Sequence, residues 1–214
     1  EVGVMTISGP NVTRGYKDAS HNGGTLRDGT LDSGDLAYTD EEGRLYIAGR
    51  SKDLIIRSGH NIDPVLIEDA LQSHPAVALA AAVGQPDKYA GELPVCYVAL
   101  KPGAQASADD LKAFAEPLIA ERPAWPKQII VIDAIPMTSV GKIFKPQLRT
   151  DAVQRLVAQV VAEAAGSNDA VVDVVVGGKR GFDVTVTLPA ALSGQQAAVE
   201  TALEGYLFDC RVRR

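Results

Sequence analysis

A change of pattern near Leu54 is the feature that most constrains the fold. Residues 1–49 are rich in glycine and turn signals, with short runs of alternating apolar and polar side chains. After Leu54, apolar runs of strand length alternate with segments of helical spacing. That alternation predicts an α+β fold in which helices pack against a sheet. We therefore expect two differently built parts that meet near this residue.

The first part has the pattern of short strands. Residues 2–7 alternate as in a strand, and residues 35–38 and 44–47 flank a polar turn that ends in Gly43, which predicts a hairpin. Fifty such residues bury little apolar surface. We expect this part to rest on structure outside the chain.

Residues 54–150 carry clear helix and strand signals. Asp63 followed by Pro64 predicts a helix start, with an N-cap and a proline at the first helical position. Ser107 and Asp110 resemble a capping box, and Pro117 predicts a kink or an early end of the helix that follows. The expected strands are residues 77–83, 94–100 and 128–133, and the apolar face of the first helix comprises Leu66, Ile67, Ala70 and Leu71.

Residues 151–214 form an extension without a chemical motif. A helix is expected from about Pro146 to Ala165, where the polar break at residues 166–169 ends it. A β-hairpin over residues 171–188, a helix over 193–207 and a strand over 208–212 are expected next. This β-β-α-β segment is large enough to pack as a subdomain.

Composition excludes several classes of function. Lys plus Arg is 21 and Asp plus Glu is 27, so the net charge is −6, which lacks the basic footprint of a nucleic-acid or membrane-surface binder. No apolar run approaches the roughly 18 residues of a membrane span. Cys96 and Cys210 lie far apart without metal-ligand spacing, which favours a reduced, cytoplasmic setting over a disulfide. The sequence begins at Glu1 in the middle of a strand-like pattern and shows no signal peptide. We therefore expect the chain to be a piece of a longer protein.

Two separated loop motifs point to a family. Residues 49–55 (Gly-Arg-Ser-Lys-Asp-Leu-Ile) lead into 58–64 (Ser-Gly-His-Asn-Ile-Asp-Pro), and 136–143 (Pro-Met-Thr-Ser-Val-Gly-Lys-Ile) follow later. Together they resemble the C-terminal portion of the adenylate-forming enzymes, which include acyl-CoA synthetases, luciferases and peptide-synthetase adenylation domains. The resemblance implies the end of the large AMP-binding domain over residues 1–50, a hinge at 51–53, the small mobile α/β lid domain over 54–150, and the extension over 151–214.

The resemblance implies two nucleotide-binding residues. Asp35, in Ser33-Gly34-Asp35-Leu36, is similar to the family aspartate that accepts hydrogen bonds from the ribose hydroxyls of ATP, and Arg50 matches an arginine that also contacts the ribose. One carboxylate offers two oxygens to a vicinal diol, and a guanidinium fork suits hydroxyl and phosphate oxygens. The residues alone also allow a turn-capping Asp35, and an Arg50 that pairs with the acidic turn at residues 40–42.

Lys52 matches the family's hinge position, where the small domain swings between adenylate-forming and thioester-forming arrangements; by itself it reads as an exposed loop lysine. Ser58, Gly59 and His60 resemble the loop that meets coenzyme A after the swing. A glycine there lets the backbone approach the pantetheine. His60 reads as a polar loop residue rather than a general base, because no serine-histidine-acid arrangement surrounds it. Asn61 stands where many acyl-CoA synthetases have arginine.

Lys142 is the expected catalytic residue. The resemblance implies that it reaches the α-phosphate and the substrate carboxylate during adenylation. A compact cation between two anions offsets their repulsion and stabilises the charge that builds in the transition state. The alternative is an ordinary solvated lysine before a helix. The stretch also resembles a signature of regulatory lysine acylation in bacterial acyl-CoA synthetases, which would make a lysine acyltransferase and a deacylase partners of Lys142.

These matches imply an acid–thiol ligase that uses ATP with Mg²⁺ and coenzyme A on a fatty or other hydrophobic carboxylic acid. The phosphate loop, the magnesium-placing glutamate and the acyl pocket are expected upstream of Glu1, in the large N-terminal domain, with no metal site in this chain. The chain alone is therefore expected to form no adenylate. Two alternatives remain: an adenylation domain that loads the phosphopantetheine of a carrier protein, and a non-catalytic regulatory module on the same scaffold.

Overall fold

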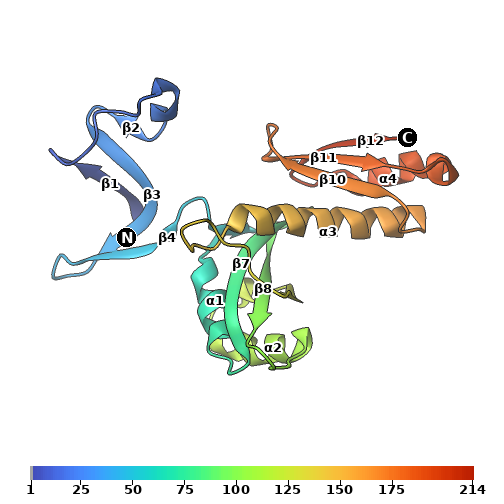
Figure 1. The fold of residues 1–214 in the computed structure, drawn as a ribbon, viewed down its shortest axis with the longest axis horizontal. Coiled ribbons are helices and arrows are strands. Elements are labelled where there is room, and N and C mark those ends of the chain that lie inside the picture. The colour runs from blue at the N-terminus through green and yellow to red at the C-terminus, as the bar shows by residue number, and fades with distance from the viewer. Residues whose placement is uncertain (1) are drawn as a thin grey trace. The chain divides into compact units, whose positions relative to one another are not determined.

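The computed structural model describes residues 2–214, and of His21 the backbone only. The chain divides into two compact units, with the division between Leu54 and Ile55. Figure 1 shows both units in chain order, from the blue N-terminal strands to the red C-terminal segment. The fold is of the mixed α+β kind that the sequence predicts.

The first unit is a small antiparallel sheet. The strands are β1 (Gly3–Ser8), β2 (Leu26–Arg27), β3 (Thr30–Thr39) and β4 (Leu45–Arg50), and the 3-10 helix η1 (Ala19–Asn22) lies between β1 and β2. The long strand β3 pairs with each of the other three strands. The β3–β4 pair is the expected hairpin. Ala37 is buried in this unit, whereas large apolar side chains such as Val4 and Ile47 are more than half exposed.

The second unit is built on a five-stranded sheet. Its strands are β5 (Ile55–Arg57), β6 (His60–Ile62), β7 (Val77–Asp87), β8 (Gly91–Leu100) and β9 (Gln128–Val131). The order is β6-β5-β8-β7, and β9 pairs in parallel with β8. The helices are α1 (Pro64–Gln72), α2 (Ala108–Ala115) and α3 (Lys145–Ala165), with short 3-10 turns η2 (Glu116–Leu118) and η3 (Arg122–Ala124) after α2.

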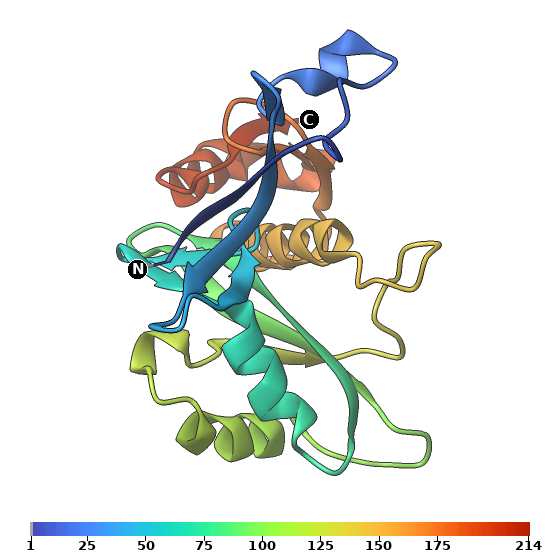
Figure 2. The ribbon, with the colours of Figure 1, turned by 90° about the vertical axis from the view of Figure 1, so that its left-hand side faces the viewer.

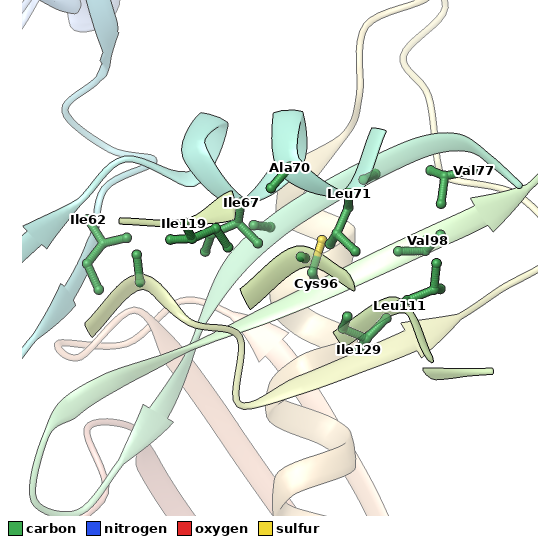
Figure 3. Packing of buried hydrophobic residues seen from close by; sticks show 14 of the residues in the cluster. Ile62, Ile67, Ala70, Leu71, Val77, Cys96, Val98, Leu111, Ile119 and Ile129 are labelled. Atoms are coloured by element: carbon green, nitrogen blue, oxygen red, sulfur yellow. The ribbon is translucent and has the colours of Figure 1, made fainter. Parts of the chain in front are cut away.

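Along β7 and β8, successive side chains point to opposite faces of the sheet, and both faces are covered by helices. Ala80, Ala82, Cys96 and Val98 point to one face and pack against α1 and α2 (Figure 3). The residues between them point to the other face and pack against Leu148 and Ala152 of α3. Strands buried on both faces read as continuous apolar runs, which is the pattern in the sequence. The members of the second cluster on β7 and β8 are Ala81, Val83, Val95, Tyr97 and Ala99.

The helix boundaries follow the local signals. The Asp63 carboxylate accepts a hydrogen bond from Val65 N, and Ser107 and Asp110 form both bonds of a capping box. The helix that contains Leu111 stops at Ala115 because Pro117 cannot continue it. One expected core position is wrong: Leu66 is 46% exposed, while its helix neighbours Ile67, Ala70 and Leu71 are buried.

The C-terminal segment has a core of its own. Its elements are β10 (Val171–Val176), β11 (Phe182–Thr187), the 3-10 helix η4 (Ala190–Gln195), α4 (Gln196–Leu203) and β12 (Asp209–Arg213). The strands form a sheet in the order β10-β11-β12, and α4 packs on α3. Helix α3 runs without a break across residue 150 and contributes Val153, Val157 and Val161 to this second core. One helix therefore joins the larger sheet to the smaller one.

Both cysteines are free thiols. Cys96 is completely buried and Cys210 is exposed, so no disulfide links them. Burial raises the pKa of the Cys96 thiol. No helix in residues 2–214 is long and apolar enough to cross a membrane.

Candidate functional site

Asp35 and Arg50 face each other across the β3–β4 hairpin. They are register partners, and Arg50 Nε donates to Asp35 Oδ1 at 3.2 Å. The side chains are 26% and 65% exposed, so the carboxylate and the guanidinium remain open to a ligand. The acidic turn at residues 40–42 is paired with Arg44 instead, through both Asp40 and Glu42. The alternative in which Arg50 pairs with that turn is therefore not what the structure shows.

An irregularity in strand β3 just before Asp35, where its register with β1 shifts, fixes this pair. Gly34 has φ +71°, a left-handed value that glycine adopts without strain, and its N–H is bonded to Asp32 Oδ1. Ser33 Oγ donates to Met5 O at 2.8 Å and accepts from Asp35 N. Ser33 thus ties the Asp35 backbone to strand β1.

The chain leaves this unit through a short turn. Ser51 N donates to Gly34 O and Asp53 N donates to Arg50 O, so the turn begins against the Asp35–Arg50 pair. Lys52 lies in the turn and is exposed. The position fits a connection between two units, and Lys52 as a hinge remains a prediction.

Ser58 and Gly59 form the tight turn between β5 and β6. Arg57 pairs with His60 across it, and the two central residues have φ values of +50° and +83°. Two successive positive φ values are typical of a type I′ hairpin turn, in which glycine is favoured and serine is strained. His60 is exposed, as expected of a polar residue, but it is the first residue of strand β6 and not part of a loop. The turn presents backbone rather than bulky side chains at its tip.

Lys142 lies on an exposed loop whose two arms are bonded to each other. Met137 and Ile143 form a β-bridge, and Phe144 N donates to Pro136 O at 2.8 Å. Inside the loop, Thr138 N donates to Lys142 O, and Thr138 Oγ1 accepts from Lys142 N at 3.1 Å. These contacts give the motif threonine a physical role, because its backbone and hydroxyl fix the lysine backbone on both sides. The Lys142 side chain is exposed.

A buried ion pair anchors the C-terminal end of this loop. Lys145 Nζ lies 2.8 Å from Glu68 Oε1, and the two side chains are 14% and 11% exposed. Glu68 Oε1 also accepts from Ala82 N at 2.8 Å, so one carboxylate connects α1, β7 and the start of α3. A cation in the first turn of a helix opposes the helix dipole, and Glu68 offsets that cost. No motif in the sequence singled out Glu68, although a glutamate on the buried side of α1 was a visible signal.

A basic pocket lies beside the Ser58–Gly59 turn. It has a volume of about 430 Å³ and is lined by Arg57, Lys112, Glu116, Arg122, Trp125, Pro126 and Lys127. Four of these side chains are cationic, and Glu116 lies 3.9 Å from Lys112. The Arg122 guanidinium sits 5.4 Å from the centre of the Trp125 ring, and Trp125 Nε1 donates to Ile119 O. The sequence patterns did not predict this pocket, because its cations come from separate elements.

The predicted site residues fall into two groups. Asp35, Arg50 and Lys52 belong to the first unit, whereas Ser58, Gly59, His60 and Lys142 belong to the second. Within the second unit, the golden loop between β9 and α3 projects on the side opposite the teal β5–β6 hairpin (Figure 2). The predicted site residues of this unit therefore lie on two separate edges.

Residues 2–214 contain no group of three or more histidine, cysteine, aspartate or glutamate side chains that would suit a metal ion. The Asp35 carboxylate is already paired with Arg50. The residues described here therefore do not fit a Mg²⁺ site.

Comparison with known proteins decides the family. Residues 66–142 match the family described as AMP-binding enzyme C-terminal domain. The chain belongs to the adenylate-forming, AMP-binding enzymes. The matched segment begins in α1 and ends at Lys142, so it includes the strands β7, β8 and β9 and most of the exposed lysine loop.

Three relatives illustrate the similarity. The chain is 44% identical to a marinolic acid–CoA ligase of Pseudoalteromonas sp. (strain SANK 73390) over 198 residues, which is 92% of this chain and 30% of that protein. It is 42% identical to a long-chain-fatty-acid–CoA ligase of Bacillus subtilis (strain 168), over 69% of this chain and 26% of that protein. An o-succinylbenzoate CoA synthetase from Bacillus subtilis in complex with its acyl-adenylate intermediate matches with a TM-score of 0.63 at 37% identity, over 70% of this chain and 30% of that one.

Two facts follow from these adenylate-forming relatives. The chain spans about a third or less of the length of each relative it matches. The match to the marinolic acid–CoA ligase covers 92% of the chain, so it extends well into the residues after 150. The C-terminal segment is thus shared with at least one CoA ligase.

Proposed function

We propose that the whole protein is an acid–thiol ligase, and that this chain supplies its mobile lid. In the first step a carboxylate oxygen attacks the α-phosphorus of ATP, the α–β phosphoanhydride bond breaks, and pyrophosphate leaves. In the second step the thiol sulfur of coenzyme A attacks the acyl carbon, its proton passes to solvent, and AMP leaves. The proposal includes the division into a large-domain end at residues 1–50, a hinge at 51–53, the lid at 54–150 and the extension at 151–214.

The observation that carries this proposal is the Lys142 loop. An exposed ammonium on a loop held at both ends can be presented to two anions with little loss of conformational freedom. Placed between the carboxylate and the α-phosphate, it offsets their repulsion and stabilises the charge of the transition state. In this proposal Asp35 and Arg50 hold the ribose of the same nucleotide.

The second step uses the other edge of the lid. The Ser58–Gly59 turn offers backbone to the pantetheine, and His60 flanks it. The basic pocket beside it supplies four cations for the phosphates of the nucleotide portion of coenzyme A. This pocket favours coenzyme A over the carrier-protein alternative, because a carrier-bound phosphopantetheine has no nucleotide to place there.

A hydrophobic carboxylic acid is the proposed substrate class. Relatives named for long-chain fatty acid and marinolic acid support it. The acyl pocket, the phosphate loop and the Mg²⁺ ligands belong to the proposed large domain. No step assigned to this chain depends on that metal.

The full-length protein tests the proposal. It is incubated with ATP, Mg²⁺ and straight-chain acids of increasing length, and with either coenzyme A or a phosphopantetheinylated carrier protein. We expect AMP, pyrophosphate and an acyl-CoA, identified by mass spectrometry. Acylation of the carrier alone would establish the carrier-loading alternative, and no adenylate with any acid would establish the regulatory module. The 214-residue chain by itself should catalyse no ATP–pyrophosphate exchange.

We also propose that acylation of Lys142 switches the enzyme off. Acylation removes the positive charge that bridges the two anions. An acyltransferase and a deacylase acting on the exposed loop would then set the active fraction. Equal single-turnover adenylation rates for acylated and unmodified full-length enzyme would contradict this regulation.

A further inference from the structure

One loop of the C-terminal segment contacts the turn between β7 and β8 of the lid. Gly205 to Phe208 connect α4 to β12, and this loop meets the turn between β7 and β8. Lys88 Nζ lies 5.1 Å from the centre of the Tyr206 ring, a distance suited to a cation–π contact. Gly205 has φ +87°, and a Cβ there would come within 3.9 Å of the Lys88 methylenes. The methylene groups and the ammonium group of Lys88 therefore both lie against this loop.

Tyr206 is itself held in place by the core of the segment. Its ring stacks on that of Phe208, with centroids 5.5 Å apart and an interplanar angle of 7°. Phe208 is 3% exposed and packs into the cluster formed by α3, α4 and the sheet β10-β11-β12. The core of the segment thus fixes the Tyr206 ring against which the Lys88 ammonium lies.

The β7–β8 turn, in its turn, supports the Ser58–Gly59 turn. Asp87 Oδ1 accepts from Tyr89 N and Ala90 N, which closes the β7–β8 turn. Ala90 O accepts a 2.7 Å hydrogen bond from Ser58 N, at the first residue of the β5–β6 turn. A continuous path of contacts therefore runs from Tyr206 through Lys88 and Ala90 to Ser58.

We propose that the C-terminal segment positions the coenzyme A turn, with Tyr206 as the positioning residue. Ser58 has a strained positive φ, and such a conformation persists only where the surroundings hold it. A turn held in its binding conformation loses less freedom when the ligand arrives. The inference rests on the proposed function, because it assigns this turn to coenzyme A. It gives residues 166–214 a role in thioester formation and none in adenylation.

Variants of the full-length enzyme test the path. Tyr206→Ala removes the ring, Lys88→Ala removes the cation without entering the core, and Tyr206→Phe keeps the ring. Leu207→Ala is the matched control, because Leu207 is 54% exposed in the same loop. The measured quantities are KM for coenzyme A, kcat, and the single-turnover rate of adenylate formation.

Tyr206→Ala and Lys88→Ala should each raise KM for coenzyme A about two- to fivefold, the range of an exposed cation–π contact. The double variant should be no worse than the more affected single variant, because both break one contact. Tyr206→Phe and Leu207→Ala should match wild type, and adenylation should be unchanged in all. A KM for Tyr206→Ala equal to that of Leu207→Ala, or a parallel fall of adenylation, would overturn the positioning role. A wild-type enzyme that makes no acyl-CoA would instead overturn the proposed function.

Discussion

Replacing Glu68 with glutamine should loosen the loop that bears Lys142, although Glu68 lies on another helix. The substitution keeps an oxygen that can accept the hydrogen bond from Ala82 N, but it leaves the ammonium of Lys145, whose side chain is only 14% exposed, without its ionic partner. Removing one partner of a buried ion pair costs about 3–5 kcal/mol. Because Lys145 keeps some access to water, we expect a loss of about 2 kcal/mol in the free energy of unfolding.

Trp125 makes this loss measurable in the 214-residue chain. It is the single tryptophan of the sequence, and it packs against the core shared by α1, α2 and the sheet of the second unit. Its fluorescence therefore follows the unfolding of that unit in urea. With a slope of about 2 kcal/mol per molar urea, a loss of 2 kcal/mol lowers the midpoint by about 1 M.

Three further variants test whether the loss comes from the Glu68–Lys145 ion pair. Lys145→Met should cost a similar amount, and the double variant should cost at least about 1 kcal/mol less than the sum of the singles, because both remove one interaction. Glu163→Gln, on the exposed side of α3, should stay within about 0.5 kcal/mol of wild type. In the full-length enzyme, Glu68→Gln should slow adenylation about tenfold by misplacing the Lys142 loop. A midpoint equal to that of Glu163→Gln, with an unchanged adenylation rate, would refute the anchoring role.

The remaining predictions concern coenzyme A and the thiols. Gly59→Ala should raise KM for coenzyme A and leave adenylation unchanged. The space beside Gly59 is open, but an alanine at φ +83° costs about 1 kcal/mol of backbone strain. An unaltered KM would contradict the assignment of this turn to coenzyme A. Arg122→Ala and Lys127→Ala should each weaken coenzyme A binding up to about fivefold in titration calorimetry, and the loss should be smaller at high salt. Lys101→Ala, outside the pocket, is the control. Equal losses of affinity in all three variants would contradict a local site. In the native chain a thiol reagent should modify Cys210 and spare Cys96 until the protein unfolds, since the thiolate is the reactive form and burial raises the pKa of Cys96. The pKa of the Cys210 thiol is also raised, by desolvation from its neighbours and by the charge of Glu200, so its reaction should speed up as pH rises above 7. Rapid modification of both thiols at neutral pH would contradict the structure.

Local chemistry made much of this fold predictable. Asp63 before Pro64 and the Ser107–Asp110 pair act within a few residues, so the helix starts could be derived from the sequence. The apolar runs at β7 and β8 predicted strands, and the structure confirms these strands and buries both of their faces. Leu66 was misjudged because the buried face of α1 is centred on Ile67 and Leu71 and extends to Glu68, which leaves Leu66 outside it.

The parts that escaped prediction depend on residues far apart in the chain. The Glu68–Lys145 pair joins α1 to α3, and the basic pocket collects cations from β5, α2 and the segment around η3. The cation–π contact of Lys88 with Tyr206 spans most of the second unit's sequence. Nothing in the local pattern specifies such pairings, because they depend on how the elements pack.

The most direct test of the central claim compares both half-reactions in full-length Lys142→Ala. Adenylate formation in a single turnover should fall by at least about 10²-fold, because the variant lacks the cation that stabilises the developing charge. Thioester formation from supplied acyl-adenylate should stay within about twofold of wild type, because that step uses the Ser58–Gly59 edge of the lid. Adenylate formation near the wild-type rate, or an equal loss in both steps, would contradict the role assigned to Lys142.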